Sequence, residues 1–216
     1  MKPRITFLGH AGFRIEGSRI IYIDPFRLKE QQPLQADLVL ITHPHYDHLS
    51  PVDIKKVLRQ NAKTQLVLPR SVDEDKNLPA QIYHLQPGEE LELDGVKIRG
   101  IPAYNITTKF HQKESNWLGY LFTLDDVIFY HTGDTELVPE MEKVKADVVF
   151  VPVGGTYTFD AQSAAEFVSM INPRIAIPMH YGTIVGSLND ALQFKRYATC
   201  YVEILQEGKT WTLKFG

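Results

Sequence analysis

Cysteine is almost absent from this chain of 216 residues, in which Cys200 is the only one. A single cysteine excludes an internal disulfide and suits a reducing compartment. The chain also lacks an apolar run long enough to span a membrane, and its first residues, MKPRITFLGH, do not have the pattern of a signal peptide. These absences predict a cytoplasmic protein with no membrane partner.

A strong excess of one charge is also missing. The chain has 23 Lys and Arg against 26 Asp and Glu, a formal charge of −3. Without a basic face, a nucleic-acid partner is unlikely. No repeat, low-complexity segment or composition break divides the chain. The 44% hydrophobic and 23% charged residues are typical of a globular protein, so residues 1–216 are predicted to form one domain.

Short apolar segments separated by turns predict that strands outnumber helices. Several segments, such as DLVLIT (37–42) and ADVVFVPV (146–153), are continuous apolar runs typical of strands buried on both faces. Helices are predicted at 50–61, 161–171 and 187–198, with Ser50 and Ser187 as caps. Strands mixed with helices predict an α+β protein in which two sheets pack together with helices outside. The predicted strands are 4–9, 13–17, 19–24, 37–42, 65–69, 81–85, 90–93, 96–104, 117–124, 127–131, 146–153, 174–179, 201–205 and 209–215.

Metal-binding side chains follow several of these apolar strands. Ligand sites form where loops leave the carboxyl ends of strands, because side chains from different strands meet in one crevice there. Strands commonly end in polar residues, but so many histidines and aspartates in these positions favour a site. The residues are Asp24, His43, His45, Asp47, His48, His131, Asp134 and His180.

The segment HPHYDH, residues 43–48, has the spacing of a site for two metal ions. His43 and His45 are two residues apart, so on an extended segment they point the same way. Asp47 and His48 follow where the chain turns and can reach a second point nearby. Imidazole and carboxylate suit zinc, and also manganese, iron or nickel. Two adjacent ions can hold a bridging hydroxide that acts as a nucleophile.

At this point the sequence resembles the metallo-β-lactamase fold superfamily. HPHYDH matches its H-x-H-x-D-H signature, HTGDT (131–135) is similar to the segment of its bridging aspartate, and IPMHYGT (177–183) to that of its last histidine. The resemblance is greatest to the small UlaG-like branch of metal-dependent hydrolases. It implies a four-layer αββα sandwich with the metals at the rim between the sheets.

The resemblance also implies roles for individual residues. His43 and His45 would bind the first metal, Asp47, His48 and His180 the second, and Asp134 both. Asp24 and His131 would support these ligands from behind. We expect Asp134, Asp47 and His10 to be the catalytic groups.

Asn105 departs from the pattern of the family. It occupies the position at which the family usually has another histidine of the first site, and an amide is a poor zinc ligand. His10 and His111 are the possible replacements. We favour His10 as the extra group at the metal rim, because it lies in the tight turn GHAG and much of its ordering comes with the hairpin.

The sequence therefore predicts a hydrolase with two divalent ions that cleaves an ester, lactone, amide or phosphodiester bond. The predicted substrate is a small molecule, with anionic compounds among the candidates. Gly155, Tyr181 and His111 are the candidate substrate-binding residues. A metal-bound sensor or binding protein without catalysis is one alternative, which Asn105 favours. A nuclease is the other, against which the near-neutral charge argues.

Overall fold

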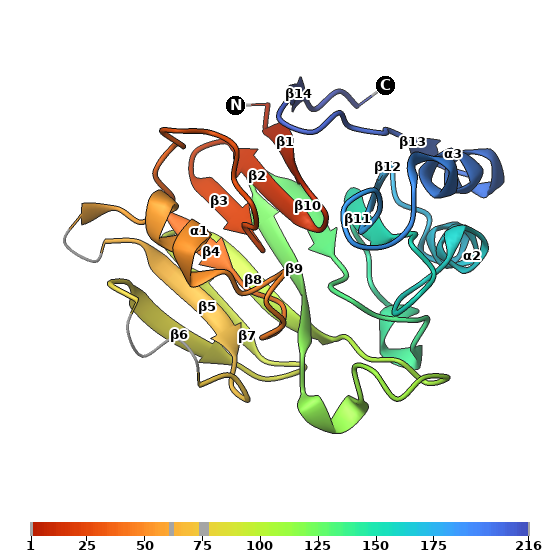
Figure 1. The fold of residues 1–216 in the computed structure, drawn as a ribbon, viewed down its shortest axis with the longest axis horizontal. Coiled ribbons are helices and arrows are strands. Elements are labelled where there is room, and N and C mark those ends of the chain that lie inside the picture. Colours follow the sequence, from red (N-terminus) through yellow and green to blue (C-terminus); the bar gives the residue numbers. More distant parts are fainter. Residues whose placement is uncertain (1, 61–62, 74–77, 216) are drawn as a thin grey trace.

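The computed structural model describes residues 2–60, 63–73 and 78–215. Within them, two seven-stranded sheets face each other (Figure 1). Helix α1 lies over the outer face of the first sheet, and α2 and α3 lie together over the second. The predicted α+β class and the αββα layering are confirmed.

The first sheet has the strand order β14-β1-β2-β3-β4-β5-β6. β1, β2 and β3 are antiparallel neighbours, whereas β3 to β6 run parallel. The apolar run of β4 is buried on both faces, as predicted, whereas the edge strand β6 is largely exposed or half-buried. The strands are β1 Arg4–Gly9, β2 Gly12–Glu16, β3 Ile20–Ile23, β4 Leu38–Leu40, β5 Gln65–Pro69, β6 Gln81–Leu85 and β14 Thr210–Thr212.

The second sheet repeats this arrangement, with the order β13-β12-β11-β10-β9-β8-β7. β7 to β10 are antiparallel and β10 to β13 are parallel. The two sheets thus have the same mixed topology, each with a parallel half whose strands end at one edge. The strands are β7 Glu90–Leu93, β8 Val96–Pro102, β9 Leu118–Leu124, β10 Val127–His131, β11 Val148–Pro152, β12 Ile175–Met179 and β13 Tyr201–Val202.

Two helices begin after the predicted caps Ser50 and Ser187, whereas the Asp160 cap of the third was not predicted. Ser50 caps α1 (Pro51–Val57), and Asp160 and Ser187 form capping boxes with the third helical residues of α2 (Ala161–Ile171) and α3 (Leu188–Tyr197). The prediction of a helix at 50–61 was too long, and its last residue lies outside the described residues. The helix ends at Val57, and beyond it the N–H of Arg59 donates to the Thr64 hydroxyl at 2.8 Å.

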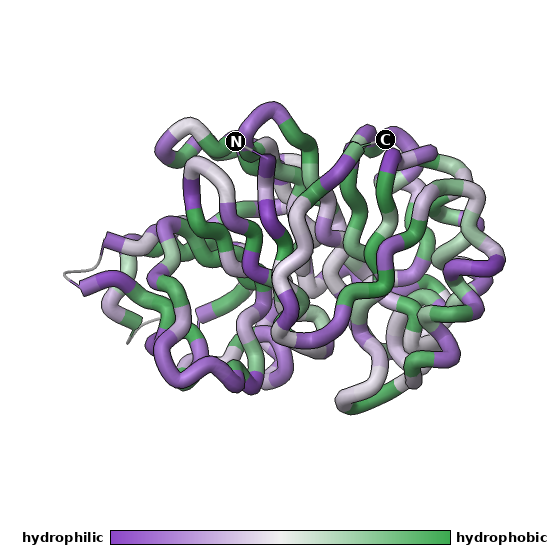
Figure 2. Tube along the Cα trace, turned by 90° about the horizontal axis from the view of Figure 1, so that it is seen from above, coloured by the Kyte–Doolittle hydropathy of each residue, from purple (hydrophilic) through white to green (hydrophobic). Residues whose placement is uncertain are grey.

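The apolar core lies between the sheets and continues beneath the helices. Hydrophobic segments gather along the strands, and hydrophilic segments lie mainly around the outside (Figure 2). A second buried cluster joins α1 to the outer face of the first sheet through Ile54 and Val57. In the described part of the chain no helix is both long and apolar enough to cross a membrane.

The parallel halves of the two sheets deliver the candidate site residues to one edge. Asp24 follows β3, His43 follows β4, Asp134 follows β10 and His180 follows β12. The turn between β1 and β2 reaches the same place, since the N–H of His180 donates to the carbonyl of His10 at 2.6 Å. The two sheets therefore supply one cluster of side chains together.

Candidate metal centre

Two neighbouring groups of side chains could each hold a metal ion. We call His43, His45 and His111 the first cluster, and His10, Asp47, His48 and His180 the second cluster. In each of them the ligand atoms lie within 4.8 Å of one another. Asp134 forms a third such group with His43 and His48, one residue from each cluster.

The first cluster has the spacing of a tetrahedral metal site. Nδ1 of His45 lies 3.1 Å from Nε2 of His43 and 3.2 Å from Nε2 of His111. Nitrogen ligands at the usual zinc distance lie about 3.3 Å apart in a tetrahedron. His45 Nδ1 therefore lies at the separation that one ion requires from both other nitrogens, and all three lie within 4.8 Å of one another.

A chain of hydrogen bonds behind the site determines which nitrogens face the ions. The Thr42 hydroxyl donates to Oδ2 of Asp24 at 2.6 Å, so it can only accept from Nδ1 of His43, at 2.9 Å. Nδ1 of His48 also lies against Oδ2 of Asp24, at 2.7 Å. Both histidines thus carry a proton on Nδ1 and turn Nε2 toward the site. Asp24 has the supporting position that the sequence predicted.

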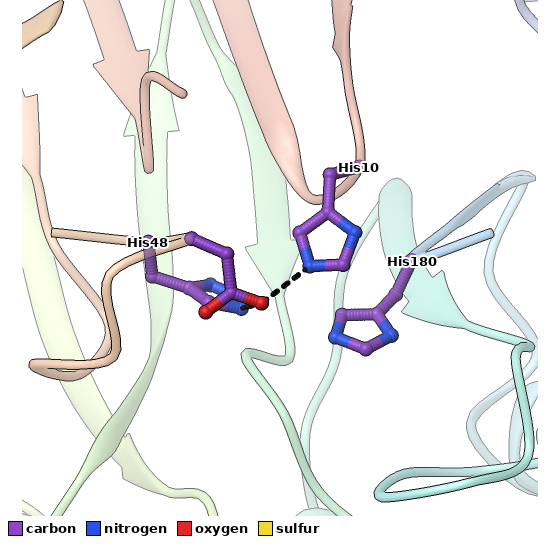
Figure 3. Close-up of side chains that lie close together, drawn as sticks. His10, His48 and His180 are labelled. Carbon is purple, nitrogen blue, oxygen red and sulfur yellow. Dashed lines mark hydrogen bonds and ion pairs between the residues drawn. The ribbon is translucent and has the colours of Figure 1, made fainter. Parts of the chain in front are cut away.

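The second cluster brings together segments that are far apart in the sequence. Figure 3 shows His10, His48 and His180 pointing toward one another from three separate segments. Nε2 of His10 lies 3.0 Å from Oδ2 of Asp47, and the His10 and His180 rings are 4.1 Å apart. This cluster contains a carboxylate of its own, which the first cluster lacks.

Asp134 lies between the two clusters. Its Oδ2 is 3.0 Å from Nε2 of His180 and 3.4 Å from Nε2 of His48, both in the second cluster. The same oxygen lies 3.9 Å from Nε2 of His43 and 4.0 Å from Nε2 of His111, in the first cluster. One carboxylate therefore contacts both prospective metal positions.

The histidines of the first cluster are held neutral, which is the form that binds metal. Burial lowers the pKa of His43 well below its ordinary value, with a further contribution from neighbouring imidazoles. Burial also lowers the pKa of His45, and it lowers that of His111 to about 4. These rings need not lose a proton at neutral pH before they bind an ion.

The second cluster combines charged carboxylates with imidazoles. Burial alone would raise the pKa of Asp47, but the contact with His10 and the nearby His48 lower it to about 2. Burial likewise opposes ionisation of Asp134, and His180 and His48 outweigh it, so its pKa falls well below the usual range. Burial lowers the pKa of His10. For His48 burial acts in the same direction, but Asp134 and Asp24 raise its pKa well above the ordinary value.

Four residues of the site have left-handed backbone conformations. φ is 53° at His10, 43° at Asp24, 55° at His111 and 58° at His180. This region is unfavourable for residues other than glycine and is tolerated where the surrounding structure enforces it. Gly154 contributes to that enforcement, because a Cβ atom there would lie 2.4 Å from the carbonyl oxygen of His180.

The residues present fit a pair of bound cations. Buried polar atoms that lack a partner are rare in proteins, yet several gather here. Among the described residues, the buried atoms of the two clusters and Asp134 that have no hydrogen-bond partner are His10 Nδ1, His48 Nε2, His111 Nδ1, Asp134 Oδ1 and His180 Nδ1. In each of these side chains the other nitrogen or oxygen already has a close neighbour, in the site or behind it.

Three other predicted residues lie close to the clusters without joining them. Both ring nitrogens of His131 are occupied, by the Ala11 carbonyl at 2.9 Å and the Gly133 N–H at 3.2 Å. The N–H of Gly155 donates to the Phe159 carbonyl at 3.0 Å. Tyr181 is buried with its ring stacked near Phe7, and burial raises its pKa to about 12.

The structure places both His10 and His111 at the metal centre, where the sequence favoured only His10. It also shows two neighbours that sequence reasoning missed. Thr42 immediately precedes the HPHYDH segment, and that position was the only signal for it. The half-buried Trp117 lies 4.9 to 5.2 Å, between ring centroids, from His43, His45 and His111. Nothing in the sequence links this tryptophan to the histidines.

Comparison with known proteins agrees with this geometry. Residues 4–180 match the Beta-lactamase superfamily domain. A UPF0173 metal-dependent hydrolase of Thermococcus onnurineus is 34% identical over 214 residues, 94% of this chain and 95% of that protein. One from Pelotomaculum thermopropionicum is 33% identical over 230 residues, 97% of this chain and all of that protein. The solved structure of Igni18, a metallo hydrolase from Ignicoccus hospitalis, is 25% identical over the whole of both chains, with a TM-score of 0.83.

Proposed function

Because the chain belongs to the β-lactamase superfamily and to its UPF0173 metal-dependent hydrolases, we propose that it is a hydrolase with two divalent ions, zinc being the best suited. The single observation that carries the proposal is the pair of ligand clusters on either side of Asp134. Three neutral imidazoles, with Nδ1 of His45 3.1 and 3.2 Å from the Nε2 atoms of the other two, suit a borderline-soft cation such as zinc.

The first cluster would hold one ion, and Asp47, His48 and His180 of the second cluster would hold the other, with Asp134 shared between them. When bound, the two ions would activate a water molecule at neutral pH and polarise the bond to be cleaved. Asp24 and Thr42 orient His43 and His48 so that Nε2 of each ring faces a metal position. They do so through hydrogen bonds to the opposite side of each ring.

His10 has the properties of a proton acceptor beside the reacting water. Burial lowers its pKa, so the ring is neutral at the start, and Asp47 lies 3.0 Å away to stabilise the imidazolium that protonation would form. Asp47 holds this proton acceptor in place through its contact with His10, and Asp134 lies between the two metal positions. We assign catalytic roles to these three residues on that basis.

The charge of the loaded site favours a substrate that is anionic or becomes so during the reaction. Asp47 and Asp134 neutralise only half of the charge of two divalent cations, and the remaining ligands are neutral imidazoles. An ester, a lactone or a phosphodiester each develops negative charge on oxygen when water attacks. The substrate class we propose is therefore a small molecule with one of these bonds.

Elemental analysis of the purified protein, before and after reconstitution with zinc, manganese, iron or nickel, tests the metal content. Turnover should then be measured with nitrophenyl esters, simple lactones and bis(nitrophenyl) phosphate. We expect up to two ions per chain and hydrolysis of at least one substrate type. Absence of bound metal would refute the hydrolase. Two bound ions without turnover would favour a binding or sensor protein, and cleavage of RNA would favour a nuclease.

A further inference from the structure

Asn105 stands where the sequence led us to expect a metal-binding histidine, and the structure gives it other partners. We propose that Asn105 is a positioning residue that holds His111 in the first cluster, so that a histidine six residues later takes the ligand position. This inference rests on the proposed function, because it assigns Asn105 a part in building that metal site.

The backbone of Asn105 closes the loop that carries His111. Its N–H donates to the carbonyl of His111 at 2.7 Å, which joins the two ends of the 105–111 segment. His111 itself has φ of 55°, a conformation that few non-glycine residues adopt without support. The hydrogen bond therefore restrains the backbone of His111, which has this unfavourable conformation.

The side chain of Asn105 ties the same loop to the rest of the protein. It is buried, with 6% of its surface exposed. Its Nδ2 donates to the backbone carbonyl of Tyr157 at 2.7 Å and to the Thr108 hydroxyl at 3.1 Å. The first bond reaches the segment that leads into α2, and the second lies within the loop.

Glu136 supports the opposite side of the loop. Its Oε2 accepts hydrogen bonds from the N–H groups of Ile106 and Thr107, each at 2.9 Å. Glu136 is two residues from Asp134, so the loop is connected to the shared ligand on this side and to Tyr157 on the other. Of the two residues whose side chains hold this loop, Asn105 and Glu136, Asn105 is the buried one.

The chemistry of the amide explains why asparagine suits this position. Both hydrogens of Nδ2 are used, and they point from one atom to two acceptors. An aspartate of the same shape has no donor, and neither ring nitrogen of histidine can donate twice. The residue that would be a poor zinc ligand is thus the one that can fasten this loop.

The experiment follows metal binding at each cluster separately. A Trp211→Phe background leaves Trp117 as the single tryptophan, and its ring lies about 5 Å from the rings of the first cluster. Metal-free protein is titrated with cobalt(II), and both the visible cobalt spectrum and Trp117 emission are recorded. The unmodified protein must first bind two equivalents. If it binds none, the proposed function fails, whatever Asn105 does.

In Asn105→Ala, the affinity for the cobalt ion whose binding changes Trp117 emission is expected to fall about tenfold to a hundredfold. This is the usual effect of losing a group behind a metal ligand. The other equivalent should be unchanged. Asn105→Asp, which keeps the shape and removes the donors, should have the same effect and serves if the alanine variant does not fold. Thr64→Ala is the matched control, because it removes a buried hydroxyl that bonds the Ala36 carbonyl and the Arg59 N–H in the first sheet, away from the site.

A double variant separates positioning from general destabilisation. If Asn105 acts through His111, then Asn105→Ala should have no further effect on cobalt affinity or spectrum in a His111→Ala background. Three results would overturn the inference. They are two equivalents of normal affinity in both Asn105 variants, an equal loss with and without His111, or the same loss in Thr64→Ala.

Discussion

The two clusters of the metal centre differ in how they are built. The second cluster has four ligand residues, one of them a carboxylate, and His10, His48 and His180 are all buried. The first cluster has three imidazoles, and His45 is exposed to solvent. Both share Asp134, so the contrast lies in the other ligands.

Their supports differ as well. His10 and His180 are joined directly by a backbone hydrogen bond of 2.6 Å, at the ends of strands in the two sheets. His111 instead comes from the loop after β8, and its place depends on contacts made by Asn105 and Glu136. Strand ends fix the position of a ligand more firmly than a loop does. The second cluster therefore resembles a preformed site, and the first depends on a correctly folded loop.

Removal of Asp134 should have the largest effect, because this residue is the only ligand common to both clusters. We expect Asp134→Ala to reduce turnover by several orders of magnitude and to lower the affinity for both ions, while the protein still folds. Metal content, turnover and circular dichroism of the purified variant measure these three properties.

Asp37→Asn is a suitable control for that variant. Asp37 is a partly buried carboxylate that bonds the Ile20 N–H and Arg59, and it precedes β4 whereas His43 follows that strand. It should keep its metals and activity. A folded Asp134→Ala protein with near-normal turnover would show that the two clusters do not work as one centre.

Much of this architecture could be predicted from the sequence. Buried apolar runs identified the parallel strands, and the placement of His43, Asp134 and His180 after such strands predicted that they would meet. Local spacing was sufficient there, because a strand end fixes both the position and the direction of the next side chain. The family resemblance then ordered these residues into two metal positions, and the clusters of the structure agree with it geometrically.

The parts that could not be predicted depend on contacts between distant segments. The loop that brings His111 to the first cluster is held by Tyr157 and Glu136, and no pattern near residue 111 indicates either of them. The place of Trp117 depends on the same loop. The single domain, the cytoplasmic location and the substrate-binding roles of Gly155 and Tyr181 stay predictions.

The hydrogen bonds behind the site allow each cluster to be weakened separately. Asp24→Asn alters the direct partner of His48, in the second cluster, whereas Thr42→Val removes the partner of His43, in the first. Asp24 also accepts a hydrogen bond from Thr42. The change at Asp24 should therefore affect both clusters, whereas the change at Thr42 should affect mainly the first cluster. We expect losses of about tenfold to a hundredfold in metal affinity. Stepwise cobalt titration measures them, and equal effects of the two variants on both equivalents would contradict this division.

The acid stability of the metal-free protein should also distinguish the clusters. The pKa of His111 falls from 6.5 to about 4 on folding, so the unfolded chain binds more protons between these values and acidification favours unfolding. The contribution is at most ~3 kcal/mol over the whole window. The pKa of His48 is raised on folding, so its contribution is present at low pH and is lost as the pH rises.

Urea unfolding of metal-free protein at several pH values between 7 and 5 measures this difference. His111→Asn should flatten the fall in stability with acid, because it removes a group that opposes folding there. His48→Asn should make the fall steeper, because it removes a group that supports folding in acid. If the two variants had the same pH dependence, the electrostatic contrast between the clusters would be wrong.

The smallest expected effect is a difference in the order of metal loss. The first cluster has fewer ligands, no carboxylate apart from the shared Asp134, and one ligand, His45, exposed to solvent. A chelator should therefore remove its ion first, with an affinity about tenfold weaker, equivalent to ~1.4 kcal/mol. In a Trp211→Phe protein, the emission of Trp117 should change as the first ion leaves and stay constant as the second does, since Trp117 contacts all three rings of the first cluster. Metal analysis at each chelator concentration gives the count. Emission that changes only with the second ion would reverse the order and would mean that the exposed His45 and the loop-borne His111 bind their ion more tightly than the buried second cluster.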